Sequence, residues 1–92
     1  MTTLARIELE LVDPARNAKR FYAMTLTFDP QLTLFPGLEA LLLVVARGRL
    51  GNKPIVRRER FVDLEPLGAR WRELVARRRQ HGYAVTCEEP KL

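Results

Sequence analysis

The sequence predicts an α+β fold in which five short strands form a sheet and one helix docks on it. Two segments near the N-terminus alternate apolar and polar residues with a period of two, which indicates half-buried strands. A later segment repeats apolar residues at helical spacing and is bounded by helix start and stop signals. A chain of 92 residues that is 47% hydrophobic and 29% charged is expected to fold as one domain, spanning 1–92 with its core over about 4–85.

The most regular alternation lies over residues 4–12, where apolar side chains occupy the odd positions and charged side chains positions 6, 8 and 10. Asp13-Pro14 ends it, because proline lacks a backbone N–H and disfavours helical geometry in the residue before it. After a loop to about Lys19, residues 20–28 alternate in the same way. We expect two strands there, paired antiparallel.

Residues 38–49 form an apolar run with mixed signals, since its leucines favour a helix while Val44-Val45 and the following glycines favour a strand. Gly51-Asn52-Lys53-Pro54 is a turn signal, and residues 55–62 can return as a strand. We therefore predict a central strand over 41–49 in a hairpin with 55–62. The heavy charge of 55–62 is typical of an edge strand.

Asp63 is a candidate cap for a helix beginning at Leu64, with Pro66 in the first turn. Gly82 is expected to end this helix in a left-handed conformation. One helix face carries Leu67, Trp71, Leu74, Val75 and Arg78, so the stripe docks on the sheet with the arginine at its end and Trp71 in the core. Residues 83–87 are predicted to form a last short strand and 88–92 a frayed tail.

The net charge of +5 is concentrated in the second half of the chain. Residues 1–46 hold four basic and five acidic side chains, whereas residues 47–92 hold twelve basic and six acidic ones. This imbalance favours an anionic partner or electrostatic steering.

The residue types give little support to an enzyme. The one histidine, His81, lies beside the helix-ending glycine and suits a helix terminus, and the one cysteine, Cys87, has no basic neighbour to activate it. Glu8 and Glu10 lie on the same face of their predicted strand. They could form a carboxylate pair, or they could simply belong to a solvated strand face. We expect no metal, no cofactor and no membrane span, and a cytoplasmic location, because the N-terminus lacks a secretory signal.

The predicted hairpin concentrates basic residues on two neighbouring strands and their turn, where residues of one face converge. They are Arg47, Arg49, Lys53, Arg57, Arg58 and Arg60. They are candidates for nucleic-acid phosphate contacts, or for a charged edge that deters aggregation. Arg77, Arg78 and Arg79 fan out around the helix, so we interpret them first as a solvated face, with Glu73 placed to pair with Arg77, and second as a nucleic-acid surface.

The run Arg47-Gly48-Arg49-Leu50-Gly51, with residues 17–22 before it and His81-Gly82-Tyr83 after it, resembles the signature of WGR domains. That family is named for a Trp-Gly-Arg that usually continues with Ile or Leu and Gly. Arg47 stands at the tryptophan position, while Gly48 and Arg49 match the family's glycine and arginine. The resemblance spans about 4–85 and implies an antiparallel sheet of about five strands with one α-helix packed on a face.

The resemblance also implies a function, because in DNA-dependent poly(ADP-ribose) polymerases this region contacts a broken DNA end. There the tryptophan stacks at the end, the glycine lets the backbone come close, and the arginine bridges to neighbouring domains. Arg47 could instead lie flat on a base or sugar and pair with phosphate. WGR domains also occur as short bacterial proteins, and we expect this chain to be of that kind.

Two hypotheses follow. The first is a nucleic-acid-binding module, most simply for DNA ends or backbone, that uses Arg47, Gly48, Arg49 and the basic strand after them. The second is a protein-interaction module of a larger bacterial assembly that has lost DNA-end binding with its tryptophan. A continuous positive face through Arg47, Arg49, Lys53 and Arg57 would favour the first, and a mixed-charge face with exposed apolar residues the second.

Overall fold

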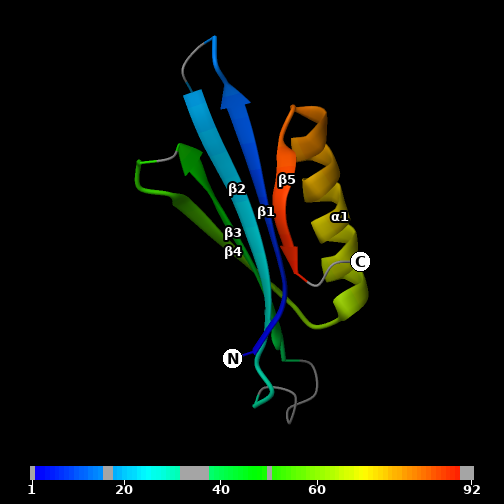
Figure 1. Ribbon diagram of the computed structural model, residues 1–92. Helices are drawn as coiled ribbons and strands as arrows, with labels where there is room; N and C mark the ends of the chain where they lie inside the picture. Colours follow the sequence, from blue (N-terminus) through cyan, green and yellow to red (C-terminus); the bar gives the residue numbers. More distant parts are fainter. Residues whose placement is uncertain (1, 16–17, 32–37, 50, 90–92) are drawn as a thin grey trace.

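Five strands and one helix make up the described part of the chain, residues 2–15, 18–31, 38–49 and 51–89 of a computed structural model (Figure 1). The sheet has the order β4-β3-β2-β1-β5, and each neighbouring pair is antiparallel. This confirms a small α+β fold with a five-stranded antiparallel sheet. The elements are β1 (Thr2–Asp13), β2 (Ala18–Phe28), β3 (Leu41–Arg49), β4 (Ile55–Phe61), α1 (Leu64–Gln80) and β5 (Ala84–Glu89).

The element boundaries follow the sequence patterns to within two residues. The ambiguous run after residue 38 forms the strand β3, in which the consecutive residues Leu41, Leu42 and Leu43 are all buried. Apolar residues occupy both faces of this strand over Leu41–Val45, so no alternation of apolar and polar residues marks it in the sequence. The expectation of a frayed tail over 88–92 is wrong in part, because β5 continues to Glu89; residues 90–92 lie outside the described part.

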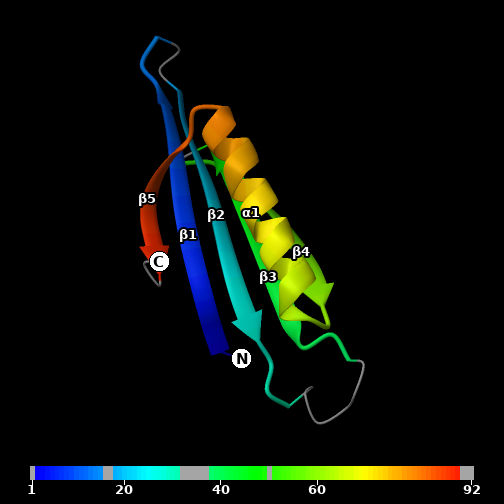
Figure 2. The ribbon, with the colours of Figure 1, turned by 90° about the vertical axis from the view of Figure 1, so that its right-hand side faces the viewer.

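The core lies between α1 and one face of the sheet, which we call the helix face (Figure 2). Alternate residues of the strands point to this face, and Leu67 and Leu74 of α1 belong to the same buried cluster. Trp71 is only partly buried but packs against the cluster. Leu9, Met24, Leu43 and Leu67 are the largest fully buried side chains.

The opposite face of the sheet, here called the outer face, lies away from α1 (Figure 2). Its central positions include Ala23, Thr25 and Val44, which are half-buried. Arg58 at one edge and Glu89 at the other are exposed. One face of the sheet is thus built into the core, and the other presents a mixture of charged, small and apolar side chains, among them the exposed Val56 and the half-buried Phe21.

The two ends of α1 differ in how they are capped. Asp63 occupies the predicted N-cap position, but its side chain makes no capping hydrogen bond, so the expected cap contact is wrong. At the other end, the Gly82 N–H donates to the Arg79 carbonyl and the Tyr83 N–H to the Arg78 carbonyl, both at 3.1 Å. With Gly82 at φ 94°, this is a Schellman motif, and it confirms the predicted glycine stop.

Candidate nucleic-acid interface

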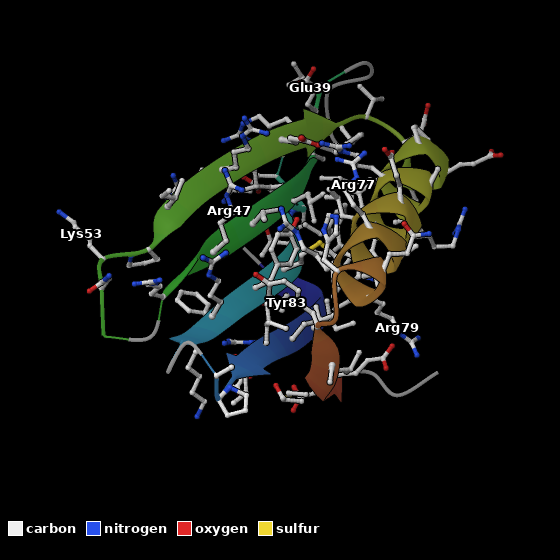
Figure 3. All side chains as sticks on the ribbon, turned by 90° about the horizontal axis from the view of Figure 1, so that it is seen from above. Glu39, Arg47, Lys53, Arg77, Arg79 and Tyr83 are labelled. Atoms are coloured by element: carbon white, nitrogen blue, oxygen red, sulfur yellow. The ribbon has the colours of Figure 1, made fainter. Side chains whose placement is uncertain are left out.

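The basic residues of the hairpin divide between the two faces of the sheet. Arg47, Arg49 and Arg57 occupy helix-face positions, whereas Arg58 and Arg60 occupy outer-face positions. Lys53 lies in the exposed turn, and its side chain points away from the sheet (Figure 3). The six basic residues therefore do not form one continuous face.

The helix-face arginines line a groove between the β3–β4 hairpin and the C-terminal half of α1. We call it the arginine groove. It consists of an inner cleft of about 180 Å³ and a more open outer cleft of about 320 Å³. The two clefts share Arg47, Ile55 and Arg78, so they form one continuous depression. In Figure 3, Arg47 and Tyr83 face this space from opposite sides.

The outer cleft is the most electropositive part of the groove. Its walls are Arg20, Arg47, Gly48, Arg49, Ile55, Arg78 and Tyr83, so four arginines meet there with no carboxylate. Arg20 and Arg49 are directly opposite each other across β2 and β3. Like charges placed opposite one another destabilise a sheet, and an anion between them would remove that repulsion.

Arg78 lies where the two clefts meet and contacts two tyrosines. Its guanidinium carbon lies 4.4 Å from the Tyr22 ring centroid and 5.8 Å from the Tyr83 ring centroid, both within cation–π distance. The two rings meet edge to face with centroids 6.5 Å apart. The Nε atom of Arg78 is buried and has no hydrogen-bond partner. Its head group is therefore oriented mainly by the two aromatic rings.

The inner cleft is less strongly positive, because two carboxylates neutralise arginines around it. Arg70 of α1 donates to Glu59 of β4 at 3.2 Å, and the pKa of Arg70 is raised above its ordinary value mainly by that hydrogen bond. Arg77 donates to Glu73 at 2.8 Å, which confirms the predicted i,i+4 pair. The remaining wall includes the apolar Val45 and Leu74. The groove thus changes from an inner end where arginines are partly neutralised by carboxylates to an outer end where arginines meet without a carboxylate.

Gly48 lies in β3 at the outer cleft. A Cβ built on it would lie 3.6 Å from the Cα of Pro54 and 3.7 Å from the Phe21 ring, ordinary contact distances. Gly48 has φ 158°, a backbone conformation that L side chains rarely adopt, and an added Cβ would point to the outer face beside Phe21 rather than into the arginine groove. The signature positions Asn17 and Leu50 lie outside the described residues.

Sequence reasoning missed Arg20, Tyr22 and Tyr83 as groove residues, and it interpreted Arg78 in two ways, as the end of the helix stripe that docks on the sheet, which is where it lies, and as part of a solvated face. Two signals were available. Arg78 continues the apolar stripe of the helix, so it had to lie toward the sheet, and the register of two adjacent strands sets Arg20 beside Arg49. The position of Tyr83 depends on the helix cap, which sequence alone marks only by Gly82.

Other candidate groups form no site of this kind. Glu8 and Glu10 share the outer face, and Glu8 forms an ion pair with Arg6, which raises the pKa of Arg6, mainly through that hydrogen bond. Cys87 is a free, half-buried thiol. Among residues 2–15, 18–31, 38–49 and 51–89, no group of three His, Cys, Asp or Glu residues is arranged to hold a metal ion.

Comparison with known proteins gives no relative. No family model, no curated protein and no solved structure matches the chain. Within the described residues, no helix is long and apolar enough to cross a membrane.

Proposed function

We propose that this protein is a nucleic-acid-binding module of WGR type that holds sugar-phosphate backbone in the arginine groove. The convergence of Arg20, Arg47, Arg49 and Arg78 on one acid-free cleft carries the proposal. Arginine suits this role because its planar fork can bond two phosphate oxygens at once and remains charged at any physiological pH. The resemblance of residues 47–51 to the WGR signature supports the same proposal.

The groove arginines would act through charge and hydrogen bonding, without reading a base sequence. Each phosphate contact releases counterions, so affinity falls steeply as salt rises. Four arginines at the outer cleft predict a log–log slope of roughly −3.

The test measures binding to a labelled, 5′-phosphorylated DNA duplex that carries a single-stranded tail of about 15 nucleotides, across a salt series. The double variant Arg47→Ala/Arg49→Ala is compared with Arg58→Ala/Arg60→Ala, which removes the same charge from the outer face of the same hairpin. We expect only the first variant to lose binding and salt dependence. Equal losses from both variants would show nonspecific attraction to net charge, and no binding of the intact protein at low salt would reject the function.

The outer face supports a second candidate function, association with a second copy of the chain. The protein exposes 6638 Å², against about 5,500 Å² for an average folded monomer of this mass. One cross-strand row runs Arg58–Val44–Thr25–Arg6–Glu89, with opposite charges at its two exposed ends. This charge arrangement is what favours a second copy as the occupant.

A two-fold axis parallel to the strands, passing near Thr25, would place Arg58 of one copy over Glu89 of the other. An axis across the strands would instead set β4 against β4 and bring like charges together, which is unfavourable. Aligned packing of two sheets is a common arrangement. With about 500 Å² of each face covered, the interface would be at the small end of the known range, so we expect weak association.

A further inference from the structure

We propose that the arginine groove accommodates an unpaired nucleotide, so that the preferred ligand is single-stranded nucleic acid rather than a blunt duplex. The phosphate would lie among Arg20, Arg47 and Arg49 in the outer cleft, and the base would lie where the two clefts meet, against Arg78 and Tyr83, with one edge toward the inner cleft. This inference rests on the proposed function, because it specifies which nucleic acid the same groove selects.

The first argument is the shape of the cationic site. The phosphates of a duplex lie on the outside of a rigid rod, and a protein reaches them best from a flat or protruding surface. Here Arg47 of the hairpin and Arg78 of α1 both line the two clefts, so the cationic groups surround a depression rather than form a flat surface. The inner cleft, at about 180 Å³, is smaller than the ~300 Å³ at which drug-sized ligand sites begin. Its size suits one ring system that has been turned out of a stack.

The second argument is the chemistry of the walls. Ile55 borders both clefts with 61% of its surface exposed, and the half-buried Tyr83 ring lines the outer cleft, whereas Tyr22, Val45 and Leu74 of the inner cleft are nearly buried. A site for phosphate alone gains nothing from this apolar surface. Bases, in contrast, stack on aromatic rings and on arginine planes, and such stacking tolerates any base because every base has a π-face.

The third argument is preorganisation at the helix end. The Schellman motif binds the Tyr83 N–H to the Arg78 carbonyl at 3.1 Å, so the two residues are fixed relative to each other by the backbone. Their side chains then contact the Tyr22 ring and each other. A guanidinium already held over an aromatic ring loses little rotamer freedom when a base stacks beside it.

The test compares three labelled ligands of equal length at one salt concentration: a thymidine oligomer, a uridine oligomer and a blunt DNA duplex, each of about 15 units. We expect at least one single strand to bind about tenfold more tightly than the duplex, and the two oligomers distinguish DNA from RNA. Tighter or equal binding of the duplex would overturn this inference and leave the proposed function in place. Failure of all three ligands to bind would overturn both.

A variant series at residue 83 separates stacking from charge. Tyr83→Phe keeps the ring and should bind single strands as the unchanged protein does, whereas Tyr83→Leu keeps apolar bulk without a π-face and should bind about 5- to 100-fold more weakly. Neither change alters a charge, so the salt slope should stay constant through the series. Thermal unfolding establishes that each variant is folded. Single-strand binding that is unchanged in Tyr83→Leu, in a folded protein, would contradict a stacking site.

Discussion

The guanidinium of Arg78 covers the Tyr22 ring at 4.4 Å, and this contact joins the core of the protein to the groove. Tyr22 is only 2% exposed and belongs to the buried cluster, so the Arg78 side chain covers one edge of the apolar core. Arginine can do this because its planar head group and methylene stem both pack on apolar surface. The same side chain also lines both clefts of the groove. In an Arg78 variant, the free energy of unfolding therefore reports its contact with the core, and nucleic-acid affinity reports its role in the groove.

We expect Arg78→Met to leave the free energy of unfolding within about 1 kcal/mol of its original value. The change gives up a cation–π contact of about 0.5–2 kcal/mol. It also removes a buried, unpaired Nε, whose desolvation costs about 1–3 kcal/mol, and replaces it with sulfur–aromatic contact. Nucleic-acid binding should nevertheless weaken at least tenfold. Urea unfolding and binding are measured on the same preparations.

The exposed neighbour provides the control for that experiment. Arg79→Met removes the same charge from α1 but from a side chain that points away from the groove (Figure 3). It should change stability by less than about 0.5 kcal/mol and reduce binding only slightly. If Arg79→Met weakened binding as much as Arg78→Met, general charge rather than groove geometry would account for the effect.

Gly82→Ala should destabilise the protein by about 1–2 kcal/mol. Gly82 has φ 94°, where an L side chain is strained, and an added Cβ would lie 3.3 Å from the Leu11 side chain. The same change disturbs the cap that fixes Tyr83 beside Arg78, so single-strand affinity should fall as well. Gly51→Ala is the matched control, because Gly51 also has a positive φ, of 91°, but has no atom within 4 Å of an added Cβ. A similar loss of affinity in both variants would rule out a specific effect of the cap.

These residues show where sequence reasoning is sufficient and where it is not. Strand alternation predicts β1 and β2 because each has one buried and one open face, and Gly82 marks the helix end because only glycine tolerates that backbone easily. The sequence also contained the information that the basic residues of the hairpin divide between the two faces of the sheet. Arg57 and Arg58 are neighbours in a strand and must therefore point to opposite faces.

The groove itself could not be derived from local patterns. To predict the groove, one must know on which side of the sheet α1 lies and that β3 pairs with β2. One must also know that the helix cap brings Tyr83 back toward Arg78. Each is a long-range result of packing. The missing side-chain bond at Asp63 shows the converse, because a residue type suited to capping does not by itself make the contact.

Glu59→Gln should strengthen nucleic-acid binding while slightly weakening the fold. The Glu59–Arg70 pair joins β4 to α1 with side chains that are 31% and 29% exposed, so its loss should cost less than about 1 kcal/mol. Glu59 is the carboxylate lining the inner cleft, and neutralising it removes repulsion of phosphate worth about twofold in affinity at a separation near 8 Å in water. Glu65→Gln, in the first turn of α1, removes the same charge outside the groove and should change affinity less. A loss of affinity in Glu59→Gln would instead assign the carboxylate a role in contacting the ligand.

Exchanging the two charged residues Arg58 and Glu89 of the outer face tests the proposed self-association. Arg58→Glu should abolish self-association measured by sedimentation equilibrium, because it would place glutamate over Glu89 of the second copy. Arg57→Glu, one residue away on the helix face, makes the same change in net charge and should leave self-association intact. The decisive variant is Arg58→Glu/Glu89→Arg. It restores opposite charges across a two-fold axis parallel to the strands and should recover the dimer, whereas it would still repel across an axis that sets β4 against β4. A protein that stays monomeric at millimolar concentration before any substitution would exclude this second candidate outright.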